Sequence, residues 1–214
     1  IDDCPFNLHP ALPYAHRVND LISEKGLARA LLHKAKSAGA FNLTAASIKG
    51  LFGFYDHAFR VLIKTEMEGI PLKHVKSIGL LNIASDFLLG MRRYDLLQSF
   101  YRAVSHGFSK KPLFYTMNFP KLAQSMWGAG FDDCTIVFNY NSSGFRTNPN
   151  LTEVKNCIKE FKSFESIAMS IFSGGRAEEV AMLLDEVPEL SGVLFGTSKK
   201  SNMEKSFELF GGVT

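Results

Sequence analysis

Apolar and polar positions follow a regular alternation along the second half of the chain. Continuous apolar stretches are typical of strands buried on both faces, and they occur at 112–119, 134–141, 166–172 and 192–198. Between and after them, apolar residues recur every three or four positions, as in amphipathic helices, at 120–130, 150–161, 176–187 and from about 200 onward. This alternation predicts parallel strands, each adjacent to the next, covered by helices.

The first half of the chain is less regular. Residues 54–67 combine a helical start with a β-branched centre from Val61 to Thr65, which predicts a strand at that centre. The other predicted elements are a helix at 19–38, a short apolar segment at 40–47, a buried strand at 74–85 and a helix at 92–107. We therefore expect an α/β fold throughout, organised as a single domain over residues 1–214.

The amino-acid composition limits the kinds of function that this chain is expected to have. With 46% hydrophobic and 21% charged residues, the chain is typical of a soluble protein with a large core. The net charge of +3 is too small to indicate a nucleic-acid partner. No apolar run approaches the roughly 18 residues of a membrane span. The three cysteines show no paired spacing, which fits a reducing cytoplasm, and the first residue, Ile1, indicates a processed chain or part of a longer protein.

Chemistry in an α/β protein is expected at the carboxyl ends of its strands, in a closed barrel and in an open doubly wound sheet alike. The predicted ends are rich in amides and hydroxyls and free of histidine, at 42–47, 64–66, 82–86, 116–118, 139–141, 170–173 and 196–198. Such a lining suits hydrogen bonds to an uncharged polar ligand or a phosphate better than metal-dependent hydrolysis. No G-x-G-x-x-G sequence follows the first strand, which counts against a dinucleotide-binding open sheet.

A few residues at these ends are candidates for chemistry. Lys64 and Glu66 would share one face of a strand and shift each other's pKa if buried together, or else form a solvated ion pair. Asn82 and Asp86 form a second candidate pair, with a turn cap as the alternative role of Asp86. Arg146, in the loop after 134–141, is suited to clamp a carboxylate or a phosphate.

The segment LFGTSKKSNMEKSFELF at 194–210 joins a glycine-ended strand directly to a helix. Backbone N–H groups and positive charge at such a helix start are suited to bind phosphate. The alternative is a capped helix, with Ser201 as N-cap and Glu204 completing a capping box.

From about residue 92 to 210 the chain resembles the aldo/keto reductase family of TIM barrels in the order and spacing of its motifs. YTMNF at 115–119 is similar to the family's G-V-S-N-F, which implies that Asn118 holds the nicotinamide amide. IVFNYN and SIAMSIFSGG resemble the sixth and seventh strands. VLFGTSKKSNMEKSFEL is similar to the closing V-x-G-x-S-x-x-x-x-I-E-E segment, which binds the adenosine-side phosphates of NADP. For that role the resemblance implies Gly196, Thr197, Ser198, Lys199 and Asn202.

The front half matches the same family less closely. Tyr55 stands near the family's tyrosine, whereas AGAFNLTAAS lacks the aspartate of the D-T-A-x-x-Y-G element. VLIKTEM resembles the third strand with Lys64 one position early, and GLLNIAS resembles the fourth with Asn82 in place of the catalytic histidine. The resemblance therefore implies a TIM-type α/β barrel, incomplete or trimmed at its N-terminal side, with an incomplete acid–base set.

These observations lead to three hypotheses. The first is a divergent aldo/keto-reductase-like protein that binds a nicotinamide cofactor, NADP or NAD, or another phosphate-bearing ligand, at the carboxyl-terminal face of the barrel. Such an oxidoreductase would transfer hydride to a small carbonyl compound, with Tyr55 or Lys64 as proton donor and Asn82 in the catalytic set. The second is an aldolase-like barrel in which Lys64 forms a Schiff base. The third is a non-catalytic barrel that binds a ligand or partner.

Overall fold

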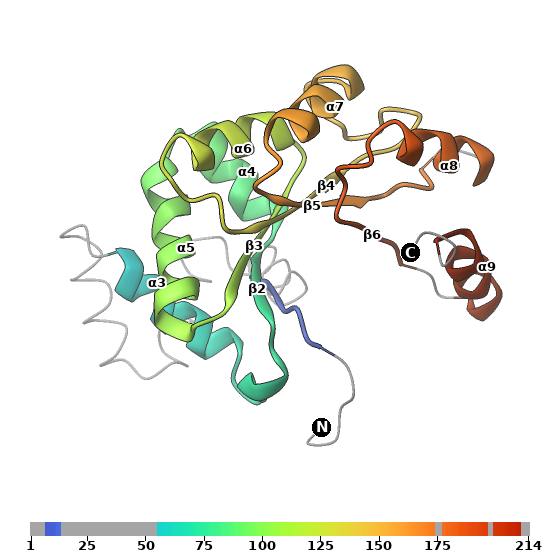
Figure 1. Cartoon of the computed structure of the whole chain (residues 1–214). Coiled ribbons are helices and arrows are strands. Elements are labelled where there is room, and N and C mark those ends of the chain that lie inside the picture. The colour runs from blue at the N-terminus through green and yellow to red at the C-terminus, as the bar shows by residue number, and fades with distance from the viewer. Residues whose placement is uncertain (1–6, 14–54, 174–176, 197–198, 211–214) are drawn as a thin grey trace, which may run out of the picture. The chain divides into compact units, whose positions relative to one another are not determined.

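The computed structural model describes residues 7–13, 55–173, 177–196 and 199–210 (Figure 1). The helix predicted at 19–38 and the apolar segment at 40–47 lie outside the described residues. The chain divides into two compact units, Ile1–Tyr115 and Thr116–Thr214. The expectation of a single domain stays a prediction.

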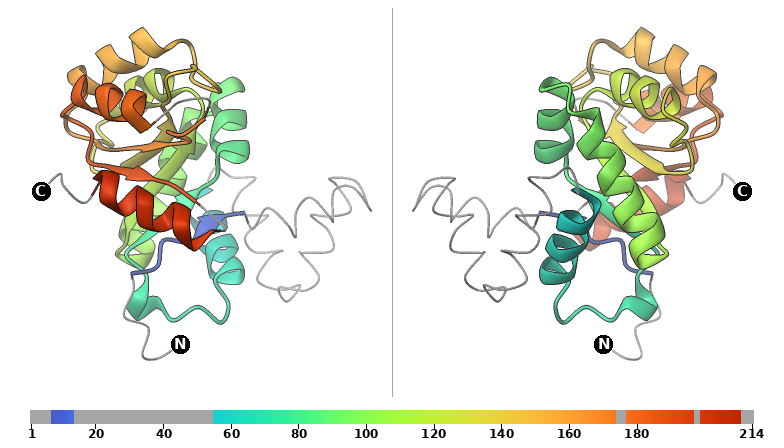
Figure 2. Two further views of the ribbon diagram at one scale, coloured as in Figure 1. Left: turned by 90° about the vertical axis from the view of Figure 1, so that its right-hand side faces the viewer. Right: turned by 90° about the vertical axis from the view of Figure 1, so that its left-hand side faces the viewer.

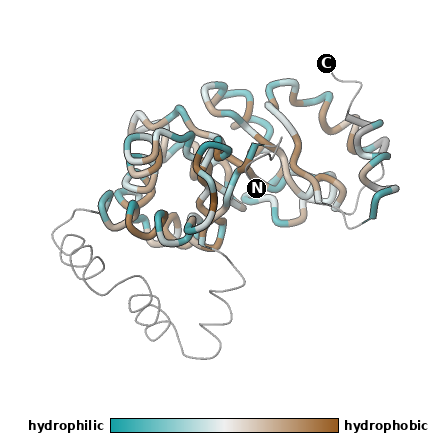
Figure 3. The backbone as a smooth tube through the Cα atoms, turned by 90° about the horizontal axis from the view of Figure 1, so that it is seen from below, coloured by the Kyte–Doolittle hydropathy of each residue, from teal (hydrophilic) through white to brown (hydrophobic). Residues whose placement is uncertain are grey.

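The described residues form a six-stranded sheet whose strands follow chain order. The strands are β1 (Ala11–Leu12), β2 (Ser77–Leu80), β3 (Lys111–Thr116), β4 (Thr135–Asn139), β5 (Glu165–Met169) and β6 (Gly192–Leu194). Within the units, β1 pairs with β2, β2 with β3, β4 with β5, and β5 with β6, all in parallel. The α/β class and the parallel sheet are therefore confirmed. Hydrophobic and hydrophilic segments alternate along the backbone (Figure 3).

The first unit places a helix layer on the face of β2 and β3 that carries Leu80 and Phe114. Its helices are α3 (Tyr55–Glu66), α4 (Asn82–Gly90) and α5 (Tyr94–Phe108), and a short 3₁₀ turn, η1, spans Leu72–His74. Phe100 of α5 meets Phe114 of β3 edge to face at 5.5 Å between ring centroids. Phe59 of α3 meets Phe100 at 5.7 Å, also edge to face. This aromatic row fixes α3 and α5 on the sheet.

The strand predicted at Val61–Thr65 is wrong, because these residues lie within α3. Phe59, Ile63 and Met67 recur every four residues, so a helix turns one apolar stripe toward α5. The β-branched residues only weakly oppose a helix, and packing against α5 overrides that preference. The Thr65 hydroxyl is satisfied inside the helix, since it donates to the carbonyl of Val61 at 3.0 Å.

The strand predicted at 74–85 is right only in part, since β2 ends at Leu80 and α4 begins at Asn82. The run GLLNIASDFLLG is apolar almost throughout and contains no internal break between strand and helix. Periodicity therefore cannot locate the boundary within it. The helix at 92–107, in contrast, is confirmed as α5 within two residues at each end.

The second unit confirms the predicted alternation. Its helices are α6 (Phe119–Trp127), α7 (Leu151–Glu160), α8 (Ala177–Asp185) and α9 (Lys200–Phe210). Helices α6, α7 and α8 lie along one side of β4 and β5 (Figures 1 and 2), and Phe119 of α6 stacks on Phe138 of β4 at 4.2 Å. On the opposite strand face, Asn139, Met169 and Leu194 lie in register across β4, β5 and β6.

Candidate functional site

A cavity of about 450 Å³ lies where β5 and β6 end, in the second unit. Its walls are the last residue of each strand and the residues that follow it, Met169–Ser173 and Leu194–Gly196. Because β5 and β6 are parallel neighbours, their carboxyl ends share one edge of the sheet. That edge is where α/β sheets and barrels bind their ligands. The strand ends predicted at 170–173 and at Gly196 therefore meet in one cavity.

The first wall is a tight turn after β5. The N–H of Ser173 donates to the carbonyl of Ser170 at 2.9 Å, and Ser170 adopts a left-handed φ of 58°. Ile171 is buried in this turn, whereas Phe172 is 38% exposed and meets Phe195 edge to face at 6.4 Å. The two walls thus contact each other through one aromatic pair, which leaves serine hydroxyls and main chain to supply the polar part of the lining.

The loop after β4 is held rigidly beside the first wall. Asn141 is completely buried, and its Oδ1 accepts hydrogen bonds from Ser143 Oγ and from the N–H of Phe145, both at 2.8 Å. Its Nδ2 donates to the carbonyl of Phe145 at 2.9 Å. Ser143 Oγ also lies 2.9 Å from the carbonyl of Ser173, which lines the cavity. One buried amide therefore fixes the loop against the cavity wall.

The same loop carries a cation over an aromatic ring. Arg146 adopts a left-handed φ of 53°, and its guanidinium lies 5.1 Å from the centroid of the Phe145 ring. Both residues are exposed, so the pair faces solvent. The prediction that Arg146 lies in the loop after a strand is confirmed, whereas its role as an anion clamp stays a prediction.

Asn118 lies two residues after β3, as predicted, where it caps helix α6. Its Oδ1 accepts from the N–H of Lys121 at 3.2 Å, and its own N–H donates to Thr116 Oγ1 at 2.9 Å. The amide oxygen thus satisfies one of the free N–H groups at the start of α6. The geometry explains Asn118 as an N-cap, and a contact with nicotinamide stays a prediction.

The residues predicted to bind phosphate lie between β6 and α9. Gly196 lines the cavity, Lys199 directly precedes α9 and is exposed, and Asn202 is the third residue of the helix. Thr197 and Ser198 lie outside the described residues. Ser201 lies inside the helix, since α9 begins at Lys200, and the predicted N-cap is therefore two positions too late.

The predicted catalytic residues belong to the first unit. Tyr55 begins α3, and its ring lies 5.4 Å from the guanidinium of Arg93. Lys64 is an exposed residue in the last turn of α3, so its placement at a strand end is wrong. Asn82 follows β2 by two residues and starts α4, which confirms its place after a strand. A catalytic role for these residues stays a prediction.

Sequence reasoning overlooked Tyr115, the next-to-last residue of β3. Its side chain is half-buried beside Gly79, where an added Cβ would come within 3.1 Å of Tyr115 Cε2. Burial raises the pKa of the Tyr115 phenol above its usual value, so the neutral hydroxyl can donate a hydrogen bond but is a weaker acid than a free phenol. The alternation of side chains along the strand could have identified Tyr115. Because successive residues point to opposite faces, Leu113 and Tyr115 share the face opposite Phe114.

The lining of the cavity is electrically neutral among the described residues, since none of Met169–Ser173 and Leu194–Gly196 is titratable. Across the part of the chain that the structure describes, no group of three or more His, Cys, Asp or Glu is arranged to hold a metal ion. In the same part, every helix is too short or too polar to cross a membrane. Positive charge near the cavity in sequence comes from Lys199 and Lys200.

Comparisons of this chain with protein-family models, with curated proteins and with solved structures gave no match.

Proposed function

We propose that the chain is a barrel-type α/β protein that binds a phosphate-bearing ligand, NADP in the first instance, at the carboxyl ends of β5 and β6. The observation that carries the proposal is the cavity between Met169–Ser173 and Leu194–Gly196. Its second wall continues along the chain into the start of α9. The aldo/keto-reductase-like motifs assign the cofactor phosphates to this same segment, so two independent lines of reasoning converge there.

The strand order supports a barrel-type arrangement. A right-handed crossover between neighbouring parallel strands places its helix on a fixed face, so strands added in one direction carry their helices on one face. A doubly wound sheet instead reverses its strand order once and carries helices on both faces. The order β1 to β6 contains no reversal within the described residues. An eight-stranded TIM barrel would need two further strands.

The start of α9 supplies the groups that a phosphate needs. The first N–H groups of a helix lack partners within the helix and carry the positive end of its dipole. Lys199 and Lys200 add charge at this end and are exposed. Lys200 Nζ lies 3.7 Å from Glu204 Oε1, an exposed pair that a phosphate can outcompete at little cost.

Reduction of a small carbonyl compound is the reaction that bound NADP would support, and binding without turnover is the second candidate. The neutral lining of the cavity favours this second candidate, because no described wall residue can act as an acid or base there. We do not propose the Schiff-base aldolase, since Lys64 is exposed on a helix rather than buried at a strand end.

Calorimetric titration of NADP tests the proposal. A charge-assisted hydrogen bond contributes about 1.5–3 kcal/mol, so loss of one lysine contact should weaken binding roughly 10- to 150-fold. The variant carrying Lys199→Met and Lys200→Met should show this loss at an unchanged thermal midpoint. Lys205→Met, an exposed residue later in the same helix, is the matched control and should bind NADP normally.

Absence of NADP and NAD binding to the unmodified chain at millimolar concentration would overturn the proposal. Consumption of NADPH with a panel of small aldehydes and ketones separates the two candidates. Turnover would establish a reductase, whereas binding without consumption would establish a binding protein.

A further inference from the structure

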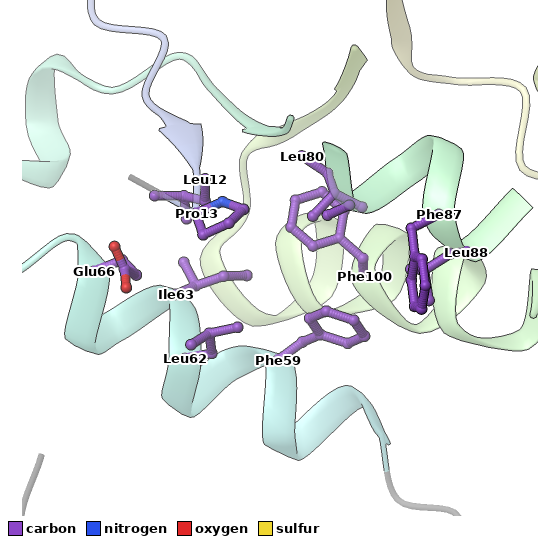
Figure 4. A pocket seen from close by; sticks show the side chains of 11 residues that line it. Leu12, Pro13, Phe59, Leu62, Ile63, Glu66, Leu80, Phe87, Leu88 and Phe100 are labelled. Carbon is purple, nitrogen blue, oxygen red and sulfur yellow. The ribbon is translucent and has the colours of Figure 1, made fainter. Parts of the chain in front are cut away.

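The first unit contains a second cavity, unrelated to the ends of β5 and β6. Helices α3 and α4 both pack against α5, and the cavity occupies the space between them (Figure 4). Its floor comes from the helix-facing side of the sheet, where Leu12 of β1 and Leu80 of β2 are paired in register.

The cavity has a volume of about 250 Å³ and an almost entirely apolar wall. Its lining residues are Leu12, Pro13, Phe59, Leu62, Ile63, Glu66, Leu80, Ala84, Phe87, Leu88 and Phe100. Glu66, the only titratable residue of the lining, stands at one end in Figure 4. The remaining side chains offer neither a donor nor an acceptor to a ligand or to water.

Side chains deep in this cavity are buried, whereas side chains at its mouth are exposed to solvent. Ile63 of α3 and Phe100 of α5 are each 1% exposed and form the buried part of the helical walls. Leu62 and Phe87, at the rim, are 43% and 64% exposed. Large apolar side chains at the rim leave area that a bound apolar group would remove from water.

We propose that this cavity is a binding site for a small uncharged apolar molecule, or for the apolar end of a larger one. Water is a poor occupant, because a stable buried water needs two to four polar partners. An apolar cavity of about 150 Å³ lined by Leu, Ile and Phe stays dry and binds benzene. At about 250 Å³, the cavity has room for a larger ring or a chain of several carbons. The site is independent of the proposed NADP function.

A homologous series of straight-chain primary alcohols, from butanol to decanol, tests this inference on the full chain. Transfer of each additional methylene into an apolar cavity should tighten binding about fourfold. The gain should stop once the chain exceeds the cavity. Methyl NMR of the isotope-labelled protein gives the affinities, and the shifts should concentrate on Leu62, Ile63, Leu80 and Leu88, which line the cavity.

The variant Ala84→Leu fills part of the cavity from α4. The gain in affinity should then stop two or three carbons earlier, which weakens the longest binders by about 15- to 60-fold. Ala129→Leu, which adds the same group at an exposed position after α6, is the matched control and should leave every affinity unchanged.

Affinity that does not depend on chain length, or shifts scattered over the whole protein, would overturn the inference. So would equal behaviour of the Ala84→Leu and Ala129→Leu variants. The variant carrying Lys199→Met and Lys200→Met should bind the alcohols normally, so that failure of NADP binding and failure of this site are told apart.

Discussion

The two cavities described above differ in polarity because they lie at different points of the same strand–helix repeat. In the second unit, the cavity lies where β5 and β6 end, so serine hydroxyls and main chain contribute to its wall. In the first unit, it lies between helices and a strand face, where the sequence must be apolar to form a core. The position of a cavity within the strand–helix repeat therefore predicts whether it binds polar or apolar groups.

The two units also differ in how aromatic side chains join helix to sheet. The first uses an edge-to-face row, Phe59 to Phe100 to Phe114, that links two helices to one strand. The second stacks Phe119 of α6 on Phe138 of β4, and Phe138 also meets Tyr140 edge to face at 6.4 Å, so this row links one helix to one strand. Phe100 and Phe138 each contact two rings, but only Phe100 joins two helices to the sheet.

The largest expected effect is that of Phe100→Ala. Phe100 is 1% exposed and contacts rings on both sides, so the substitution should lower the free energy of unfolding by about 3–5 kcal/mol. Phe138→Ala should fall in the same range, because Phe138 is equally buried and also contacts two rings. Urea unfolding gives both values. Phe145→Ala, 52% exposed, is the control and should change stability by less than about 0.5 kcal/mol.

The same variants test whether the chain is a single cooperative domain. Trp127, the only tryptophan, lies in the second unit and reports its unfolding by fluorescence. If the chain is one domain, Phe100→Ala should shift the fluorescence transition as far as the transition seen by circular dichroism. A fluorescence transition that stays in place would contradict the single-domain prediction.

A smaller effect is expected from Asn141→Ala, which removes the buried amide that holds the loop after β4. The three partner atoms on Ser143 and Phe145 would lose a buried partner, which costs about 1–3 kcal/mol in total. The Phe145 amide should also exchange with solvent faster, because its hydrogen bond ends at Asn141 Oδ1. Ser142→Ala, at an exposed position of the same loop, should alter neither quantity.

The difference between the two units extends to how well the sequence predicts them. After residue 110 the strands and helices fall where periodicity puts them, since apolar runs and amphipathic stretches are separated by clear breaks. Between residues 54 and 90 such breaks are missing, and tertiary packing determines which residues form helices and which form strands. Val61–Thr65 turns helical against α5, and α4 follows β2 after a single residue, Leu81.

The residues of the candidate site likewise include some that the sequence predicted and some that it did not. Ser170, Ser173 and Gly196 were predicted at strand ends, and adjacent parallel strands bring such ends together. The role of Asn141 was not predictable, because its three hydrogen bonds depend on the path of the loop that they themselves fix. Tyr115 was overlooked because its half-burial depends on Gly79, a neighbour on another strand.

The smallest effect is expected at the ion pair that joins α3 to α5. Arg102 Nε and Nη2 lie 2.8 and 3.1 Å from the two carboxylate oxygens of Asp56, and both side chains are about one-third exposed. Burial alone would raise the pKa of Asp56. Hydrogen bonds from Arg102 and Ser99, with the nearby arginine charges, outweigh burial and lower this pKa below its usual value of 3.8. At this exposure the pair contributes about 1 kcal/mol or less.

The variant Asp56→Asn should reveal this contribution through its pH dependence. Because the folded-state pKa is the lower one, the stabilisation is fully present above pH 3.8 and is lost as the pH falls through the folded-state pKa. Urea unfolding from pH 7 to pH 2 should therefore show the variant less stable at neutral pH, with the difference shrinking in acid. Arg102→Met should give the same profile, and the double variant should add no further pH dependence. A difference that stays constant down to pH 2 would assign the loss to packing between α3 and α5, and the charge of Asp56 would then contribute nothing.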